Sequence, residues 1–538
     1  MNFSDRIFVL SNIILTPDAS FEEAFSVARK RLRALALKDT DFSYSIFRKS
    51  IDARRKNDIK TVYSVSVSGK FSAAQAAKLL REGYSELKSD TPLPTVGTEE
   101  LKAPPLVVGT GPAGLFAALL LAELGYKPLV LERGGSVSER VAKVAAFEKS
   151  RILDTDTNIQ FGAGGAGTFS DGKLITRIGD GFSSYVISRF IEFGAPAEIA
   201  YLAKPHIGTD ILSAVVENML KRIETLGGRV LYRTTFLEPL TDTAGRAYAA
   251  RTTAGDLPIG AIILATGHSA RDTYEMLFER GFSTEAKPFS VGMRIEHLTE
   301  DIDRAMYGDL ADHPSLGHAE YALSHNTKVR GVYTFCMCPG GEVVCAASEG
   351  GGVVTNGMSR HDRGGKNSNS AVVCSVFKED YGATPKGAIE LQRRIERAAF
   401  ASGGGTYSAP MITVGDFVSG KLENEPKRIL PTYMNGGVVL ASPYDYLPSF
   451  VCDGIKDALF AFDKKLDGFA VGDAVLTGAE TRTSAPIRIL RDRESRTAPG
   501  FENIYPAGEG AGYAGGITSA AIDGVRSAMA LIERYKPV

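Results

Sequence analysis

The chain has 538 residues, a formal net charge of −1 and an isoelectric point near 6.7. This length implies two or three domains, and the near-neutral charge excludes a global attraction to nucleic acid or to anionic lipid. The N-terminal sequence lacks the features of a signal peptide, and no apolar run is long enough for a membrane span. With only 5 cysteines and no disulfide framework, we expect a cytoplasmic protein.

Residues 1–90 predict a small α+β domain. Three apolar or alternating segments predict strands, at residues 7–15, 42–51 and 60–67. Ser20 with Glu23 forms a capping-box pattern that opens a helix, and residues 72–87 predict a second helix. The proline-containing residues 91–104 predict a linker.

Residues 105–285 predict the first part of a dinucleotide-binding domain. A GxGxxG motif follows the apolar strand 106–108, and its glycines are Gly109, Gly111 and Gly114. They allow a tight turn, close approach of backbone to a pyrophosphate, and close packing of helix on strand. A helix starting near Pro112 directs its amides at the phosphates, and Glu132, at the end of the next strand, is placed to accept hydrogen bonds from ribose hydroxyls. This motif predicts a dinucleotide without separating NAD from FAD.

Residues 481–538 return to the strand, glycine loop and helix pattern, which favours FAD because a long cofactor needs a second holding element. Gly508 and Glu509 follow a strand, and Gly515 and Gly516 precede a helix starting near Ile517. Glu509 is placed to accept from ribityl hydroxyls or to position phosphate contacts. The helix N-terminus stabilises negative charge at the flavin N1/O2 edge by about 0.3–1 kcal/mol when exposed.

Motifs that run nearly end to end carry a family resemblance. Besides the two fingerprints they are SIDARRK (50–56), NIQFGAGGAGTFSDGKL (158–174), KPHIGTD (204–210), ATGHSARD (265–272), FCMCPGG (335–341) and ETRTSAPIRI (480–489). With them the chain resembles the bacterial family of uncharacterised FAD-dependent dehydrogenases, within the glutathione-reductase-type flavoproteins that have a single dinucleotide-binding domain. Glu509 departs from the wider superfamily, where aspartate is more usual.

This resemblance implies an α/β fold, with a three-layer, Rossmann-like FAD-binding domain around a parallel sheet. A mixed, β-rich substrate domain at 286–480 interrupts it, and the FAD is bound non-covalently. The glycine loop of the middle motif is expected to lie against the flavin, with residues Gly162, Gly164, Gly165, Ala166, Gly167, Thr168, Ser170 and Asp171. For the last two, a turn or a helix cap is the competing interpretation. Other residues assigned to FAD are Pro112, Ala113, Arg133, Phe236, Thr266 and Gly267.

Candidate catalytic residues are His206 and Arg482. His206 precedes a helix that we expect Thr209 to cap, and it could orient substrate, act as acid or base, or serve only the structure. Arg482, with Arg488, could clamp a carboxylate or fix its loop through ion pairs. His268 and Arg271 lie near the dinucleotide as a consequence of the fold.

Cys336 and Cys338 are the cysteine pair considered as a candidate for redox chemistry. Redox-active dithiols usually have the spacing CxxC, and an i, i+2 disulfide on a strand is strained, so small buried residues are the competing interpretation. The remaining cysteines lack ligand spacing to histidines, and we expect no metal site.

No second GxGxxG that leads through a helix to an acid-ended strand occurs after Glu132, so we expect a small-molecule substrate and an external electron donor or acceptor to dock directly at the flavin. The substrate is expected to enter between the flavin and residues 285–480. Basic residues at 48–56 leave an alternative open, an FAD-containing module that binds RNA or a protein partner. We favour a charged turn or a docking surface there, and we expect neither membrane nor nucleic-acid binding.

Overall fold

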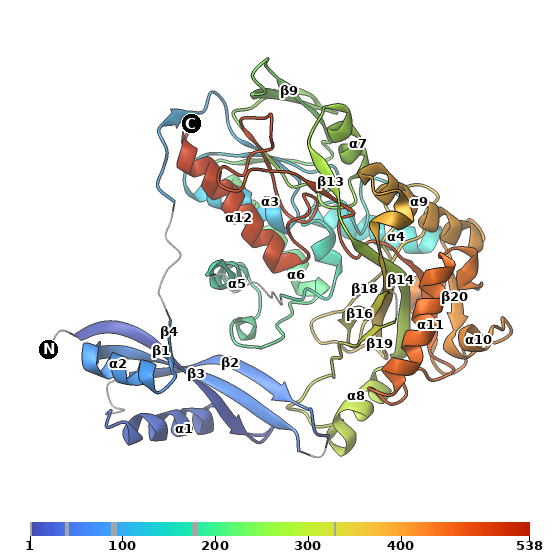
Figure 1. Cartoon of the computed structure of the whole chain (residues 1–538). Helices are drawn as coiled ribbons and strands as arrows, with labels where there is room; N and C mark the ends of the chain where they lie inside the picture. Colours follow the sequence, from blue (N-terminus) through green and yellow to red (C-terminus); the bar gives the residue numbers. More distant parts are fainter. Residues whose placement is uncertain (1–2, 38–41, 57, 88–93, 175–180, 328–329) are drawn as a thin grey trace.

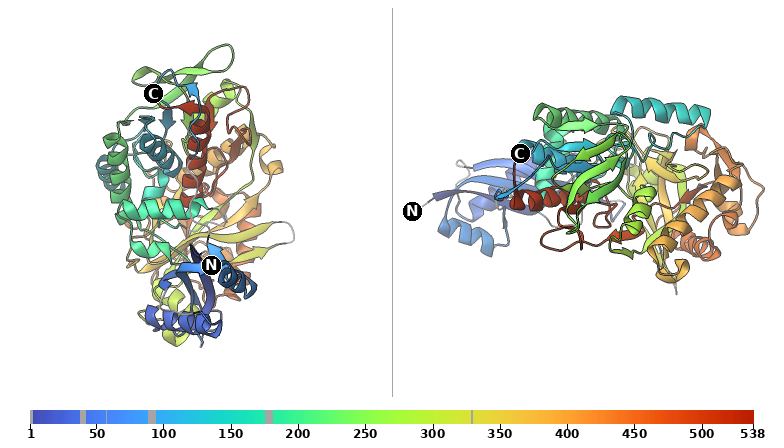
Figure 2. Two further views of the ribbon diagram at one scale, coloured as in Figure 1. Left: turned by 90° about the vertical axis from the view of Figure 1, so that its left-hand side faces the viewer. Right: turned by 90° about the horizontal axis from the view of Figure 1, so that it is seen from above.

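The computed structural model describes residues 3–37, 42–56, 58–87, 94–174, 181–327 and 330–538. Three principal sheets organise the chain: an N-terminal antiparallel sheet, a central parallel sheet and a large, mostly antiparallel sheet (Figure 1). The view from above in Figure 2 shows the N-terminal sheet and the large sheet at opposite ends, with the parallel sheet between them.

The N-terminal unit is a sheet with strand order β2-β3-β1-β4, covered by two helices. Its elements are β1 (Phe3–Leu15), α1 (Phe21–Ala34), β2 (Phe42–Asp52), β3 (Lys60–Ser72), α2 (Ala73–Arg81) and β4 (Ser85–Leu87). The capping box of Ser20 and Glu23 is present, as predicted. The single helix predicted over 72–87 was wrong, because the chain turns at Gly83 (φ 82°) and then pairs with β1 as β4.

The parallel sheet has strand order β24-β12-β6-β7-β8, which confirms the predicted Rossmann-like α/β core. Its strands are β6 (Leu106–Val108), β7 (Leu129–Leu131), β8 (Arg229–Leu231), β12 (Ile262–Leu264) and β24 (Ile504–Pro506). On one face, Val107, Val130 and Ile263 pack against helices. Those helices are α3 (Pro112–Glu123), α6 (Thr209–Thr225) and α12 (Ile517–Arg534).

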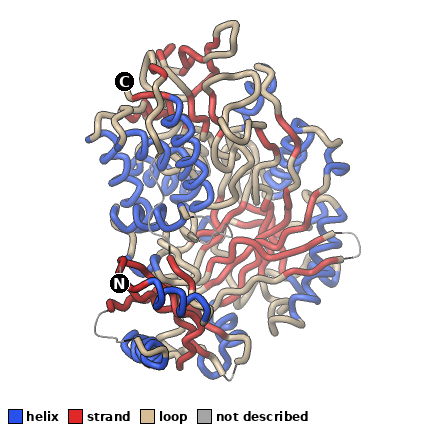
Figure 3. The backbone as a smooth tube through the Cα atoms, turned by 60° about the vertical axis from the view of Figure 1, so that its left-hand side comes forward, coloured by secondary structure: helices blue, strands red, loops and turns tan. Residues whose placement is uncertain are grey.

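The opposite face of the parallel sheet completes a three-layer arrangement. There, alternate strand residues such as Val108 and Leu264 pack against a small antiparallel sheet and a helix. These elements are β9 (Phe236–Thr241), β10 (Ala247–Thr252), β11 (Gly255–Pro258) and α7 (Arg271–Glu279). Figure 3 shows the helical layer on one side of this core and the large sheet beside it.

The large sheet has seven strands in the order β15-β16-β19-β14-β22-β20-β21. They are β14 (Phe289–Leu298), β15 (Ser324–Asn326), β16 (Gly331–Cys338), β19 (Asn367–Val376), β20 (Ala409–Thr413), β21 (Val438–Leu440) and β22 (Val475–Glu480). Helices α8 (Thr299–Tyr307), α9 (Pro385–Ser402), α10 (Val414–Ser419) and α11 (Ser449–Asp463) surround it. A separate hairpin pairs β17 (Glu342–Cys345) with β18 (Thr355–Met358).

The remaining elements connect these layers. They are α4 (Val137–Ser150), α5 (Phe182–Glu192), β13 (Thr284–Ala286), β23 (Ile487–Ile489), β5 (Glu99–Glu100) and β25 (Tyr535–Lys536). The basic end of β2 docks on the central part of the molecule, because Lys49 N donates to Tyr201 O (2.7 Å) and Ala203 N donates to Lys49 O (2.8 Å). In the described part of the chain, no helix combines the length and apolarity needed to cross a bilayer.

Candidate functional site

A pocket of about 380 Å³ opens where the carboxyl ends of β6, β7, β12 and β24 meet the large sheet. Its volume falls within the range typical of cofactor and ligand sites. The parallel strands deliver Gly109, Glu132, Thr266 and Gly508 to this edge. Such an edge is where open α/β sheets bind their ligands, because loops from several strands converge there.

The turn after β6 brings backbone close to the pocket. Gly109 has φ 96°, and a Cβ there would lie 2.5 Å from the Ala265 carbonyl oxygen, so only glycine fits without strain. Gly111 is the N-cap of α3, and Pro112 occupies the first turn of that helix. No side chain of the described residues caps this N-terminus, so its amides are available to an anion.

Glu132 lies at the end of β7 and is 5% exposed. Its carboxylate accepts hydrogen bonds from the backbone N–H groups of Gly134 (3.0 Å) and Gly162 (3.0 Å), and from the Thr110 hydroxyl. It therefore ties the first fingerprint to the glycine loop. The predicted contact between Glu132 and ribose stays a prediction.

The glycine loop is held from behind by a buried arginine of α4. Arg140 is fully buried and donates to the carbonyl oxygens of Asn158 (2.8 Å), Ile159 (2.7 Å) and Ala163 (2.8 Å). Burial lowers the pKa of Arg140 to about 10. These bonds leave the other side of the loop, at residues 165–167, to line the pocket.

The C-terminal fingerprint closes the pocket from the other side. Gly508 has φ 77°, and its N–H donates to Asp523 of α12 (2.7 Å). A Cβ at Gly508 would lie 2.6 Å from the Ala113 Cβ, so this loop touches α3 directly. Helix α12 begins at Ile517, as predicted, and no side chain of the described residues caps its N-terminus.

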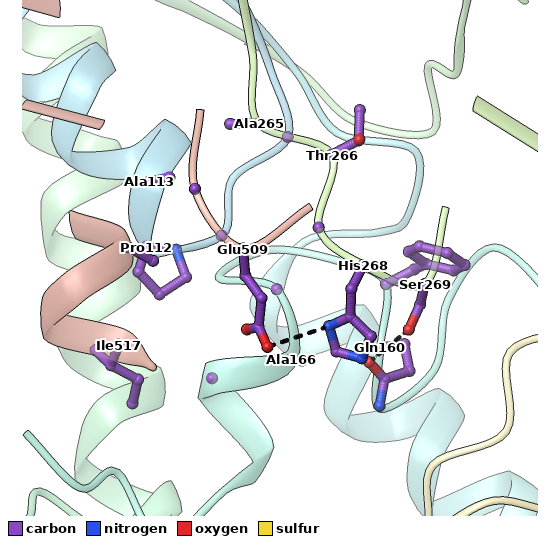
Figure 4. A pocket seen from close by; sticks show the side chains of 18 of the residues that line it. Pro112, Ala113, Gln160, Ala166, Ala265, Thr266, His268, Ser269, Glu509 and Ile517 are labelled. Atoms are coloured by element: carbon purple, nitrogen blue, oxygen red, sulfur yellow. Dashed lines mark hydrogen bonds and ion pairs between the residues drawn. The ribbon is translucent and has the colours of Figure 1, made fainter. Parts of the chain in front are cut away.

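Glu509 and His268 lie next to each other in the pocket wall (Figure 4), with 3.7 Å between His268 Nδ1 and the Glu509 carboxylate. Burial raises the pKa of Glu509 to about 7, against the opposing effect of Lys287. Burial, with Arg482 and Arg271 nearby, lowers the pKa of His268 to about 3. His268 is therefore neutral near pH 7, and Glu509 becomes neutral as the pH falls below about 7, which suits a site for a cofactor that carries its own negative charge.

The pocket collects most of the residues predicted to bind the cofactor. Those lining it are Gly109, Gly111, Pro112, Ala113, Glu132, Arg133, Gly165, Ala166, Gly167, Ser170, Asp171, Phe236, Thr266, Gly267, Gly508, Glu509, Gly515, Gly516 and Ile517. Four others stand behind the lining: Gly114, Gly162, Gly164 and Thr168. Gly114 has the packing role predicted for it, because a Cβ there would collide with the Gly109 carbonyl oxygen.

The two candidate catalytic residues lie in different places. Arg482 lines the pocket, but its guanidinium already donates to Glu396 (3.1 Å), Ser269 (2.9 Å) and Ser348 (2.6 Å). His206 lies outside the pocket lining, where its Nε2 is 3.0 Å from the His361 carbonyl oxygen. The Thr209 cap was wrong: Gly208 is the N-cap of α6, and the Thr209 hydroxyl donates to Thr168 O (2.6 Å).

Sequence reasoning expected residues 285–480 to face the flavin and singled out Cys336, but it did not identify the other residues of the wall that the large sheet and its hairpin contribute. That wall consists of Phe335 and Cys336 of β16, Asn356 of β18 and Glu480 of β22. Gln160 and Lys173, from the middle motif, also line the pocket without having been singled out. Only the presence of FCMCPGG and ETRTSAPIRI among the matching motifs hinted at these positions.

The described residues fit FAD. Two uncapped helix N-termini suit its pyrophosphate and its flavin edge. A Cβ placed at Gly267, Gly515 or Gly516 would meet no described atom within 4 Å, so backbone there faces open pocket. The buried His268 Nε2 has no hydrogen-bond partner among the described residues, and a cofactor in the pocket could supply one.

Three family models match separate parts of the chain. Residues 288–483 match the model described as "FAD-dependent protein, C-terminal domain-like". Residues 107–168 match an NAD(P)-binding Rossmann-like domain, and residues 9–68 match a domain of unknown function. An uncharacterized protein of Clostridium beijerinckii is 45% identical over 523 residues, which cover 96% of this chain and 97% of that protein.

Solved structures of flavoenzymes are similar only at a low level. An L-amino acid deaminase from Proteus vulgaris lacking its specific insertion is 10% identical, with 83% of this chain and 93% of that one covered and a TM-score of 0.34. An L-proline dehydrogenase from P. horikoshii is 12% identical, with 80% and 94% covered and a TM-score of 0.32. Scores this low do not establish a shared overall fold.

Proposed function

This chain belongs to a family of FAD-dependent oxidoreductases, and from that premise we propose that it exchanges a hydride between flavin N5 and a small substrate. One observation carries the proposal: a single pocket joins the glycine turns of both fingerprints to side chains of the large sheet. Bound FAD supplies the redox chemistry, and the protein supplies geometry and electrostatics.

The residues around the pocket have separable roles in this proposal. The α3 N-terminus and the turn at Gly109 bind the pyrophosphate, and the α12 N-terminus stabilises negative charge at the flavin edge. Phe335, Asn356 and Glu480 contact the substrate, because they approach the pocket from outside the dinucleotide-binding core.

The finer assignment, a dehydrogenase among the glutathione-reductase-type flavoproteins, is part of the proposal. The described residues hold no second unit in which a GxGxxG turn leads through a helix to a strand that ends in an acid, which supports electron exchange with a donor or acceptor that docks at the flavin itself.

The proposal is tested on the purified holoprotein in two steps. Heat denaturation followed by chromatography should release FAD, close to one molecule per chain. Anaerobic photoreduction should then bleach the flavin band, and one class among the small acceptors added should restore it rapidly. Stable reduced flavin in the presence of all acceptors, with tight binding of RNA or a protein partner instead, would favour the binding-module alternative.

A further inference from the structure

Strand β16 is irregular where it meets the pocket. Its pairing with β19 shifts register between Phe335 and Cys338, and Cys336 has φ 45°, a left-handed conformation that is uncommon for a residue other than glycine. Phe335 and Cys336 both line the pocket, although successive side chains of a regular strand point to opposite faces. The bulge therefore aims a cysteine at the cofactor pocket.

The unusual backbone is held by two hydrogen bonds to one carbonyl group. Arg294 Nη1 donates to Cys336 O (2.9 Å), and the Cys338 thiol donates to the same oxygen (3.4 Å). Arg294 is fully buried, and its Nε pairs with Glu480 (3.2 Å) on the neighbouring part of the pocket wall. A buried ion pair that fixes a left-handed cysteine is the kind of local strain that marks functional sites.

The two thiols occupy different electrostatic environments. The neighbouring Cys338 side chain lowers the pKa of Cys336, and Arg294 and Lys173 lower it further, whereas burial and Asp171 raise it. The Cys336 side chain, followed by burial, raises the pKa of Cys338. Cys336 is partly exposed and Cys338 is buried. A partly exposed cysteine with a lowered pKa beside a buried cysteine with a raised pKa is the arrangement of an attacking and a resolving cysteine.

We infer that Cys336 and Cys338 are a redox-active dithiol, and that the substrate class of this pocket is a low-molecular-weight disulfide. The inference rests on the proposed function, because FAD shares the same pocket. A small disulfide is favoured because Cys336 lines a pocket of about 380 Å³ that also takes the cofactor.

The chemistry balances in two exchanges and one reduction. The Cys336 thiolate attacks the substrate disulfide RSSR, forms Cys336–S–S–R and releases RS⁻. Cys338 then displaces the second RS⁻, which takes up the Cys338 proton and leaves the Cys336–Cys338 disulfide. The substrate has gained two electrons, and the protein has lost two. Reduced FAD, the electron source in the proposed function, returns the disulfide to the dithiol with two electrons and two protons.

In a regular strand, a disulfide between residues i and i+2 is strained. Around Cys336 the strand is not regular, because the pairing of β16 with β19 shifts register and Cys336 has a left-handed backbone conformation. Strained disulfides are also the labile ones that catalysis uses. The other cysteines, Cys345, Cys374 and Cys452, are buried and do not line the pocket.

The first test needs no electrons from the flavin. The reduced thiols of anaerobic holoprotein are mixed with 2,2′-dithiodipyridine, and thiopyridone release is followed by absorbance. Wild type should release two thiopyridones per chain in a fast phase. Cys338→Ser should release one and keep the second pyridyl group in a mixed disulfide with Cys336. Cys336→Ser should show no fast phase. Cys374→Ala, on the adjacent strand β19, is the matched control and should retain the wild-type phase.

Peptide mass spectrometry of wild type keeps the test decisive if a variant misfolds. After the fast phase, peptide 331–360 should have lost two hydrogens, with only Cys345 left to alkylate. Alkylation of Cys336 should also have a midpoint well below about pH 8.5, the value for an ordinary thiol. A fast phase that survives in Cys336→Ser, or an ordinary alkylation midpoint, would overturn the inference.

The second test links the dithiol to the flavin. Photoreduced holoprotein is mixed with the same disulfide, and wild type should regain its flavin band at least about tenfold faster than Cys336→Ser. If other acceptors reoxidise the flavin while the cysteines prove unreactive, the inference fails and the proposed function stands. If the dithiol reacts but the disulfide does not reoxidise the flavin, the inferred link between the dithiol and the cofactor fails, and the proposed function fails as well only when no other acceptor reoxidises the flavin.

Discussion

The two sides of the pocket present different chemical groups. The glycine wall, residues 109–113, 165–167, 508–509 and 515–516, presents mainly backbone, whereas the sheet wall, Phe335, Cys336, Asn356 and Glu480, presents side chains. A cofactor is the same in every turnover, and backbone groups of fixed geometry suffice to hold it. A substrate must be selected, which needs side chains of specific shape and charge. Cofactor affinity and substrate chemistry can therefore be altered separately in this molecule.

A buried ion-pair cluster beside the pocket links helix α7 to helix α9, and breaking it should have the largest effect. Glu396 of α9 accepts from Arg271 of α7 (2.7 and 2.8 Å) and from Arg482. In Glu396→Gln the two buried arginines lose their shared counter-charge, so we expect the free energy of unfolding to fall by about 3–5 kcal/mol. Chemical denaturation at saturating FAD measures this change.

Glu390→Gln is the matched control on the same helix. Glu390 and its partner Arg397 (3.6 Å) are more than half exposed, so the expected change is only about 0–1 kcal/mol. Equal losses in the two variants would show that the buried cluster stabilises the fold no more than an exposed ion pair does.

The glycine wall should be sensitive to a single methyl group. A Cβ at Gly515 meets no described atom within 4 Å, so Gly515→Ala should fold normally but place its methyl group in the pocket. Overpacking costs about 1–3 kcal/mol, which corresponds to about 5- to 150-fold weaker FAD binding. A flavin-fluorescence titration measures the dissociation constant. Gly350→Ala, equally open but outside this pocket, should bind FAD like wild type; weakened binding there would point to a global defect.

Glu509 should make FAD affinity depend on pH. Its pKa is raised to about 7 by burial, so it is mostly neutral below that pH and becomes an anion above it. Affinity for the anionic cofactor should be full below about pH 7 and fall as the pH rises, by about tenfold if FAD raises this pKa by one further unit. His268 stays neutral across this range because its pKa is about 3, and Lys287 opposes the effect. Titrations from pH 6 to 8.5 should show the decline in wild type and a flat profile in Glu509→Gln; a decline in both would assign it to another group.

The sequence could predict the glycine wall because its signals are local. Gly109, Gly111 and Gly114 sit within one turn between a strand and a helix, and the helix at Ile517 follows directly from its own glycines. The sheet wall depends instead on pairings far apart in the chain, such as β16 with β19 and β14 with β22, which no short motif encodes.

Two local errors have local physical causes. Residues 72–87 are apolar enough for one helix, but Gly83 turns the chain and the sheet edge at β1 captures residues 85–87. Thr209 has the side chain of a helix cap, yet Gly208, with φ 84°, takes the cap position and leaves the hydroxyl to bond the glycine loop.

The FAD affinity of Phe335→Ala tests most directly whether the glycine wall binds the cofactor and the sheet wall contacts the substrate. Phe335 is 36% exposed and lies on the sheet wall, so its truncation should not disturb the fold. We predict an FAD dissociation constant within about threefold of wild type, because less than about 0.7 kcal/mol should be lost, together with slower reoxidation of the photoreduced flavin by the substrate. A loss of FAD affinity as large as that of Gly515→Ala would contradict these separate roles, because the sheet wall would then hold the cofactor.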